Sequence, residues 1–320
     1  IHHADQPEGS RTLQELIVTG LNREIARLCR GCNLDPAGLI LAAVAGNTAM
    51  THLFMGLDPK WLIREPYIPV INRPDLVQAA ELGLDLNPRA RVFIFPNIGS
   101  YFGGDLIAGI LFAGIHRREE TTLMVDVGTN AEVVLGNRNW LIACAGAAGP
   151  ALEGGVTKMG MMAGPGVIDQ VALDPDSQQV QIRTIDDRPP VGICGSGLID
   201  LAACLFLSGM LDIRGKLVPD RGNDRIVQRE GLTHFVVVSG KESGTGEDLT
   251  ISQADLDSLI RSKAAMYTIL ETISESVGAA LLDLGAFFVA GTFGSFINPR
   301  SAISIGMLPD LPLAAYRSLG

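Results

Sequence analysis

Hydrophobic residues fall into short apolar runs and longer stretches with helical spacing, and the two patterns alternate as in an α/β protein. The apolar run Leu123–Val127 breaks into Gly128-Thr129-Asn130, and further β-rich runs follow at 131–135 and 140–144. Turn-forming residues at 136–139 separate the last two runs. This stretch predicts a three-stranded meander, and the rest of the chain is organised around it.

The first turn of the predicted meander combines residue types that suit a bound phosphate. Gly128 lets backbone N–H groups approach an anion, Thr129 and Asn130 add side-chain donors, and Asp126 can hold a hydrated Mg²⁺. An ordinary tight turn beside a solvated aspartate would use the same residue types, so that alternative stays open. Residues 126–130 are therefore a candidate site for a nucleotide phosphate.

Two further strands are predicted upstream of the meander. The continuous apolar run 39–45 is expected to be a strand buried on both faces, followed by Gly46-Asn47-Thr48 and a helix over 49–55. Ligands bind at the carboxyl ends of strands in α/β folds, but Asn47 is better explained as the cap of that helix. A second strand, 92–95, precedes Gly103-Gly104-Asp105 and a helix of small apolar residues.

The other upstream segments are assigned from local signals. Thr12 and Glu15 indicate a capping box at the start of a helix whose apolar positions run from Leu13 to Leu28. Residues 56–90 are rich in Pro, Asp and Asn, which indicates a surface excursion.

Two glycine-rich turns follow the meander. Residues 145–155 contain Glu153 as their single acid, and residues 191–197, which include Gly195, Ser196 and Gly197, open an apolar helix over 198–207. A glycine-rich loop at a helix N-terminus can bind an anion through its N–H groups and the helix dipole. A close-packed turn would need the same glycines, so both interpretations stay open.

The remaining pattern predicts a hairpin over 170–184, a long helix and a final strand. Ser252 and Asp255 form a capping-box signature at the start of the longest helix. The last buried strand, 287–290, ends in Gly291-Thr292-Phe293-Gly294.

Composition limits the class of protein. Of 320 residues, 47% are hydrophobic and 19% charged, which predicts a folded chain of two domains. The formal net charge of −10 argues against partners such as nucleic acid or an anionic membrane surface. Five cysteines, an odd number, together with no secretory signal and no apolar run long enough for a membrane span, predict a cytoplasmic protein with reduced thiols. The chain starts in mid-pattern without Met, so we expect it to be a fragment.

Around residue 123 the chain resembles the superfamily of acetate and sugar kinases, large heat-shock chaperones and actin. Asp126–Asn130 looks like a phosphate hairpin, Leu152–Gly155 resembles the glycine segment that follows it, and Val289–Gly294 is similar to the adenosine motif. This resemblance implies an α/β fold in which two ribonuclease-H-like (actin-like ATPase) domains surround a nucleotide cleft.

The same resemblance implies a domain division. Residues 1–118 would be the C-terminal part of the first ribonuclease-H-like domain, with its surface excursion at 56–90, and residues 119–320 would be the second domain. Nothing upstream of Thr12 could supply the first domain's own phosphate hairpin. We therefore expect the first domain to be incomplete in this fragment.

A closer resemblance spans nearly the whole chain. The segments that resemble reductive activators of corrinoid proteins are AGNTAMTHL (45–53), FGGD (102–105), DVGTNAE (126–132), AAGPALEG (147–154), GICGSGLIDL (192–201) and AGTFGSF (290–296). In that family a [2Fe–2S] ferredoxin-like domain precedes an ATPase-like domain, and ATP drives reduction of a Co(II) corrinoid to Co(I). No plant-type C-x₄-C-x₂-C spacing occurs here, so the [2Fe–2S] cluster is expected outside this fragment.

The family resemblance also implies residue roles and partners. Asp126 would orient Mg²⁺ through water, and Asp105 and Glu153 are weaker candidates for a catalytic acid that positions water. The implied positions for ATP are Gly128, Thr129, Asn130, Gly195, Ser196, Gly197, Gly291 and Gly294. The implied partners are a corrinoid protein and an electron donor to the upstream ferredoxin-like domain, and a homodimer is compatible with the sequence.

Two other functions stay open on the sequence alone. A small-molecule phosphotransferase of the same superfamily could use the cleft with Asp105 or Glu153 as base. A non-catalytic docking module is also compatible, because Asn130 stands where the superfamily often has Thr or Gly and Phe293 is bulky for an adenosine segment. Phosphorylation of a substrate without corrinoid dependence would favour the first alternative, and absence of nucleotide binding the second.

Overall fold

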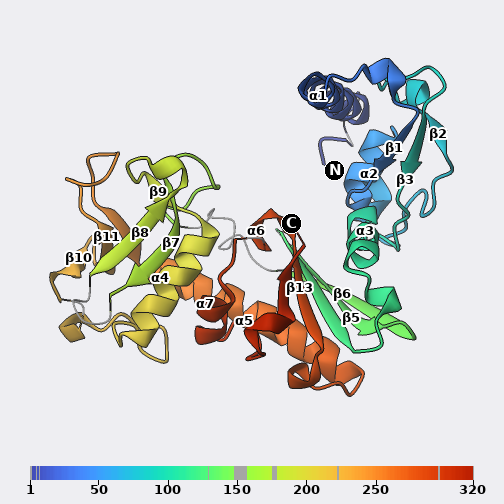
Figure 1. Ribbon diagram of the computed structural model, residues 1–320. Helices are drawn as coiled ribbons and strands as arrows, with labels where there is room; N and C mark the ends of the chain where they lie inside the picture. The colour runs from blue at the N-terminus through green and yellow to red at the C-terminus, as the bar shows by residue number, and fades with distance from the viewer. Residues whose placement is uncertain are drawn as a thin grey trace. The chain divides into compact units, whose positions relative to one another are not determined.

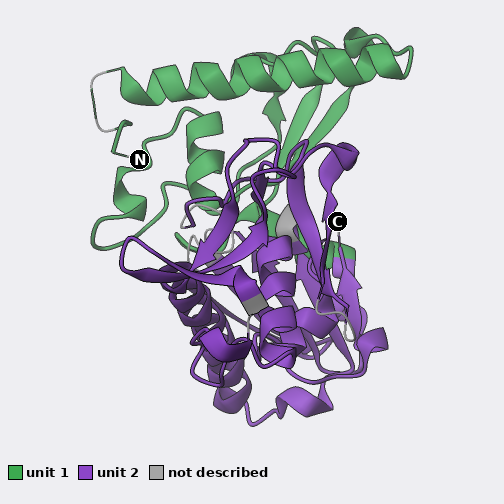
Figure 2. Ribbon diagram, turned by 90° about the vertical axis from the view of Figure 1, so that its left-hand side faces the viewer, with its two compact units in different colours: residues 1–112 green, residues 113–320 purple. Residues whose placement is uncertain are grey.

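The computed structural model describes residues 2–4, 6, 8–128, 130–147, 157–174, 179–221, 223–294 and 296–319. The chain forms two compact units, Ile1–Phe112 (unit 1) and Ala113–Gly320 (unit 2), which are coloured separately in Figure 2. Among the described residues, no helix is both long and apolar enough to cross a membrane.

Unit 1 is a small three-stranded sheet with helices (Figure 1). Its elements are α1 (Gly9–Gly31), β1 (Leu41–Val44), α2 (Thr48–Phe54), β2 (Val77–Gln78), β3 (Arg91–Ile94) and α3 (Gly104–Ala113), which runs just into unit 2. The strand order is β1-β3-β2, with β1 parallel and β2 antiparallel to β3. The two parallel strands therefore end at the same edge, where α2 and α3 begin.

The end of the segment expected to be a surface excursion, residues 79–90, contributes to the core of unit 1, so the prediction does not hold for that part. Ala79, Leu82 and Leu84 are buried with β3 against the apolar face of α1. The Asn22 side chain on α1 also bonds to this segment, with Nδ2 donating to Gly83 O at 2.9 Å. The first part of the segment is more exposed, since Ile68, Val70 and Leu76 are each more than half exposed.

Strand β1 was expected to be buried on both faces, and only one face is. Ala42 and Val44 pack on the unit 1 core, whereas Leu41 is 64% exposed. Its neighbour Phe93 on β3 is 40% exposed on the same side. A continuous apolar run predicts a strand, but it does not show whether a second layer of structure covers the strand's other face. This explains the error.

Helix α1 begins at Gly9, three residues before Thr12, the predicted cap. The Thr12 hydroxyl donates to Glu8 O within the helix at 3.1 Å, and Glu15 accepts from Arg11 at 2.9 Å. The expected capping box therefore does not form. By contrast, Asn47 caps α2 as predicted, because its side chain accepts from Met50 N–H at 2.8 Å.

His52 on α2 is fully buried, and its hydrogen bonds fix the neutral ring. Nδ1 lies 2.7 Å from Thr48 O, so it donates, and Nε2 accepts from Val70 N–H at 3.0 Å. Burial lowers the pKa of His52, partly opposed by the bond to Thr48 O. A protonated ring would lose the Val70 bond.

We expect His52 to make unit 1 less stable in mild acid. The unfolded state binds its proton at about pH 6.5 and the folded state only at lower pH, so stability is present above that value and falls as pH drops toward the folded pKa. Urea unfolding from pH 7.5 to 5 should show a shallower pH dependence in His52→Gln than in wild type. The exposed His3→Gln variant is the control, and equal slopes for both variants would contradict the prediction.

Unit 2 is built on a five-stranded sheet that contains the predicted meander. The sheet has the order β14-β13-β4-β5-β6, and its strands are β4 (Thr122–Val127), β5 (Asn130–Asn137), β6 (Trp140–Ala147), β13 (Ala286–Ala290) and β14 (Tyr316–Ser318). Strands β4, β5 and β6 pair antiparallel, which confirms the meander. Strand β13 pairs parallel with β4 on the other side.

In the described part of unit 2 there are also two smaller sheets and several α-helices (Figure 1). The sheets are β8-β7-β9 and β10-β11-β12, formed by β7 (Val167–Leu173), β8 (Val180–Thr184), β9 (Gly192–Ile193), β10 (Ile226–Arg229), β11 (Leu232–Val238) and β12 (Leu249–Ser252). The helices are α4 (Gly195–Leu207), α5 (Gln253–Ser276), α6 (Gly291–Gly294) and α7 (Pro299–Ser304). The predicted hairpin is β7–β8, and its turn at 175–178 lies outside the described residues.

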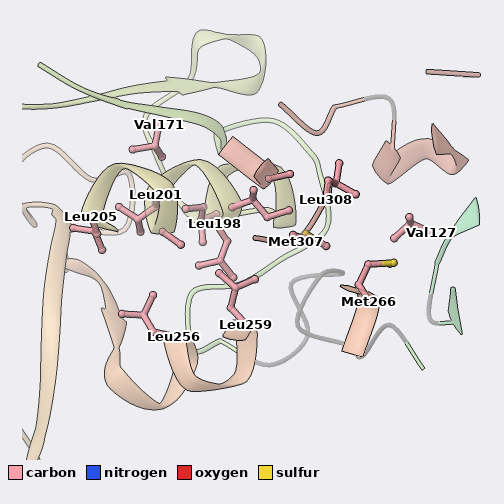
Figure 3. Packing of buried hydrophobic residues seen from close by; sticks show 14 of the residues in the cluster. Val127, Val171, Leu198, Leu201, Leu205, Leu256, Leu259, Met266, Met307 and Leu308 are labelled. Atoms are coloured by element: carbon pink, nitrogen blue, oxygen red, sulfur yellow. The ribbon is translucent and has the colours of Figure 1, made fainter. Parts of the chain in front are cut away.

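One continuous core joins the parts of unit 2. Figure 3 shows Val127 of β4 near Met266 of α5 and Leu308, while Leu198 of α4 packs in the same cluster. Helix α5 begins at the predicted capping box, since Ser252 and Asp255 bond reciprocally. The elements that carry the candidate site are thus held by a shared hydrophobic interior.

Candidate functional site

The candidate site lies where β4 and β13 end side by side. The parallel register places Ala290 opposite Asp126, so the residues after both strands leave the sheet at one edge. Gly291 has φ +84°, and a Cβ added there would lie 3.0 Å from Asp126 Oδ1 and 3.0 Å from Val127 O. The glycine therefore allows the backbone to pass directly beside the carboxylate.

Replacing Gly291 with alanine should lower the stability of unit 2 by about 1–3 kcal/mol, since it adds left-handed strain and a clash with Asp126. Gly278→Ala is the matched control, because its φ is +65° and no atom lies within 4 Å of the added Cβ. Thermal unfolding should therefore show a larger loss for Gly291→Ala. Equal losses would mean that the Asp126 side chain moves away from the added methyl group without a cost in stability.

A second acid at this edge was missed in the sequence analysis. Antiparallel pairing of β4 and β5 places Glu132 directly opposite Asp126. Side chains of directly opposed residues lie on the same face, with Cβ atoms about 5 Å apart. Asp126 and Glu132 each have a further interaction within the protein. The register of a tight hairpin could have identified Glu132, because Val127 pairs with Ala131 across the turn.

The predicted site residues around the turn of the meander lie partly outside the described residues. Gly128 follows β4 directly, but Thr129 and Glu153 lie outside the described residues. Asn130 begins β5, and only its backbone is described, in register with Ala147. The roles of these residues remain predictions.

The Gly195-Ser196-Gly197 turn is packed against β7. Ser196 is 3% exposed, and its hydroxyl donates to Asp169 O at 3.0 Å. A Cβ on Gly197 would lie 2.6 Å from Ile168 O. This geometry is that of the close-packed turn weighed in the sequence analysis, and contact of these residues with a nucleotide stays a prediction.

Gly294 also has a packing reason. A Cβ there would lie 2.4 Å from Val289 Cγ1, so the glycine lets α6 fold back on the end of β13. The two glycines are thus required by different contacts. Gly291 is needed because of its closeness to Asp126, and Gly294 because of the packing of α6 on β13.

Asp105 belongs to unit 1, whereas Asp126 belongs to unit 2. Its Oδ1 accepts from Leu106 N–H at 2.9 Å in the first turn of α3. A Cβ on Gly103 would lie 2.5 Å from Asp105 Oδ1 and 2.4 Å from the Cα of Asn47. Asp105 therefore lies close to the carboxyl end of β1, the edge at which unit 1 would present groups to a ligand.

The five cysteines, all among the described residues, form no disulfide. Across the described part of the chain, no group of three or more His, Cys, Asp and Glu side chains could hold a metal. Burial raises the pKa of the Cys144 and Cys204 thiols, which favours their protonated, non-ligating forms. These cysteines do not fit an iron–sulfur cluster.

Comparison with known families matches both parts of the chain. Residues 120–320 match the family described as the C-terminal domain of RACo, the ASKHA domain, and residues 1–118 match the RACo middle region. The chain belongs to the RACo family. Its C-terminal part therefore has the actin-like ATPase (ASKHA) fold expected from the sequence.

Two curated proteins and one solved structure are similar over almost the whole chain. The corrinoid activation enzyme RamQ of Eubacterium limosum is 31% identical over 98% of this chain and 54% of its own length. The [Co(II) methylated amine-specific corrinoid protein] reductase of Methanosarcina barkeri is 24% identical over 94% of this chain and 56% of its own. The chain thus spans about half the length of these relatives.

The similar structure is a reductive activator for corrinoid, iron–sulfur protein. It superposes with a TM-score of 0.86 at 40% identity, and the match covers 99% of this chain and 50% of that one. The expected resemblance to reductive activators of corrinoid proteins is confirmed by these matches. The domain division at residues 118/119 stays a prediction.

Proposed function

We propose that this chain is the ATP-binding, ATP-hydrolysing and partner-docking module of an activator that reduces a corrinoid protein from Co(II) to Co(I). The observation that carries the proposal is the close approach of Gly291 to Asp126, at the joined ends of β4 and β13. A glycine backbone beside a carboxylate at this edge supports a phosphate–Mg²⁺ site in an ASKHA domain.

The residues present fit Mg²⁺ and ATP. Proteins usually bind Mg²⁺ through one or two carboxylates, with water and substrate phosphates completing the shell. Asp126 and the opposed Glu132 supply such a pair without a dedicated cage. A side chain at Gly291 would crowd the Asp126 carboxylate, so the glycine keeps that carboxylate unobstructed.

Bound Mg-ATP would supply free energy through hydrolysis of its terminal phosphate. Asp126 and Glu132 would orient the hydrated metal, Gly128 with Thr129 and Asn130 would donate to phosphate, and Asp105 or Glu153 would position water. The backbone at Gly291 and Gly294, after the end of β13, would pass close to the adenosine. The positions 195–197 remain candidates for ribose or phosphate.

The reduction itself needs one electron for each Co(II) converted to Co(I). Since the described cysteines do not fit a cluster, no electron-transfer step is assigned to these residues. Reduction to Co(I) is uphill, and a nucleotide can drive it only if the two nucleotide states bind the corrinoid protein with different affinities. The proposed contribution of this chain is that difference in affinity.

The test is Mg-ATP hydrolysis by the intact activator with and without its Co(II) corrinoid partner. We expect the partner to stimulate hydrolysis in the wild type and Asp126→Ala to abolish it. Nucleotide binding without partner dependence, together with phosphorylation of a small substrate, would identify a phosphotransferase instead. Absence of nucleotide binding by the intact protein would favour a non-catalytic docking module instead.

A further inference from the structure

The loop from β3 to α3 (residues 95–103, the β3–α3 loop) ends just before Asp105 and follows a closely held path. It folds back on itself, because Ile98 N–H donates to Phe102 O at 2.7 Å. Directly after the loop, Asp105 N–H donates to Gly46 O at 3.3 Å, at the carboxyl end of β1. The path of this loop therefore determines where Asp105 lies at the edge of the unit 1 sheet.

Asn97 near the start of the loop is 3% exposed, and its side chain holds the loop through its amide nitrogen. Nδ2 donates to Asn72 Oδ1 at 2.9 Å and to Gly99 O at 3.4 Å. Asn97 Oδ1 has no hydrogen-bond partner within the described part of the chain. Because a buried oxygen without a partner is unfavourable, an apolar side chain would be more stable here if the position only filled space. The asparagine is therefore explained by the two groups to which its Nδ2 donates.

Asn72 supplies the acceptor groups from outside the loop, in the segment expected to be a surface excursion. Its Oδ1 accepts from Asn97 Nδ2 and also from Gly99 N–H, at 3.3 Å. Its backbone oxygen accepts from Asn97 N–H at 2.9 Å. One exposed residue thus binds both the start of the loop and its turn at Gly99, whose φ is +71°.

The residues before Asn72 are bonded to unit 1 as well. Ser100 Oγ in the loop donates to Tyr67 O at 2.7 Å, and Val70 N–H donates to Nε2 of the buried His52 at 3.0 Å. These contacts keep Asn72 against the β3–α3 loop, although the segment around it is largely exposed.

We propose that Asn72 is a positioning residue for Asp105. Its Oδ1 fixes Asn97 and Gly99, and the loop to which they belong sets the position of the Asp105 carboxylate. The inference rests on the proposed function and takes Asp105, rather than Glu153, as the acid that positions water for ATP hydrolysis. It assigns to Asn72 no contact with the nucleotide or the water. Loss of Asn72 Oδ1 should therefore slow hydrolysis without weakening nucleotide binding.

The test measures kcat for Mg-ATP hydrolysis and the Mg-ATP dissociation constant of the intact activator. We expect Asn72→Ala to lower kcat about tenfold and to leave the dissociation constant within about twofold of wild type, because a small displacement of a catalytic group affects the reaction more than binding. Asn72→Asp, which keeps an acceptor oxygen for Asn97 and Gly99, should restore most of the rate. In an Asp105→Asn background, Asn72→Ala should have little further effect, since both changes act through the same carboxylate.

Asn22→Ala is the matched control, because Asn22 on α1 bonds to a later part of the same segment. Its Nδ2 donates to Gly83 O at 2.9 Å, and its Oδ1 accepts from Asp85 N–H at 3.0 Å. Neither bond involves the β3–α3 loop. The substitution should lower thermal stability but leave kcat unchanged. Amide hydrogen exchange over 97–106 should rise in Asn72→Ala and stay at the wild-type level in Asn22→Ala.

The two proposals fail separately. If the wild type hydrolyses Mg-ATP, then a wild-type kcat in Asn72→Ala, or effects of Asn72→Ala and Asp105→Asn that simply add, overturns the positioning inference alone. If the wild type does not hydrolyse Mg-ATP, the proposed function is overturned together with the role of Asp105 in it. The exchange over 97–106 still decides whether Asn72 holds the loop, and exchange equal to that of Asn22→Ala would show that it does not.

Discussion

Asp126→Asn is expected to slow Mg-ATP hydrolysis by the intact activator at least about 100-fold, because metal ions contribute several kcal/mol of transition-state stabilisation. The amide keeps the size of the side chain but removes the charge that would hold hydrated Mg²⁺ opposite Glu132. The melting temperature should change little, since Asp126 is only partly buried at the end of β4. Phosphate release and thermal unfolding of the same samples measure both effects.

The control for the lost charge is Asp257→Asn. Asp257 lies on α5 and binds Lys216 at 2.8 Å on the surface of unit 2. Its substitution should leave hydrolysis within about twofold of wild type, because exposed ion pairs contribute little. Hydrolysis by Asp126→Asn at the wild-type rate would place the catalytic metal elsewhere.

Phe287→Ala is expected to destabilise unit 2 by about 3–5 kcal/mol, the usual range for deletion of a buried aromatic side chain. Phe287 is 0% exposed on β13, between β4 and β14, and its ring centroid lies 5.1 Å from that of Tyr316. The loss should appear as a lower urea midpoint with an unchanged slope.

Phe296→Ala provides the comparison, because Phe296 is 56% exposed and follows the same strand by a few residues. Its effect should stay within about 0.5 kcal/mol, as for most surface substitutions. Similar losses for the two variants would show that β13 is not a central support of the fold.

Local signals predicted the structure well where neighbouring residues determine it. The meander followed from three β-rich runs and their turns, and the caps at Asn47 and Ser252 followed from side chains that reach the next turn of the helix. Local signals failed where burial depends on distant segments. The exposed face of Leu41 and the buried side chain of Leu82 both depend on what packs against them in unit 1.

The candidate site shows the same contrast between local signals and contacts of distant segments. The sequence identified Asp126 and Gly291 separately, but they lie 165 positions apart, and only the pairing of β4 with β13 brings them together. The position of Glu132 opposite Asp126 follows from the hairpin alone, because a tight turn determines which residues face each other.

Helix α5 connects two sheets of unit 2. Its 24 residues span about 36 Å, beginning against β11 and β12 and passing over β5 and β6 of the meander. Leu256 near the start and Ile273 near the end both lie in one buried cluster, so α5 connects the meander to the distant sheet through a continuous core.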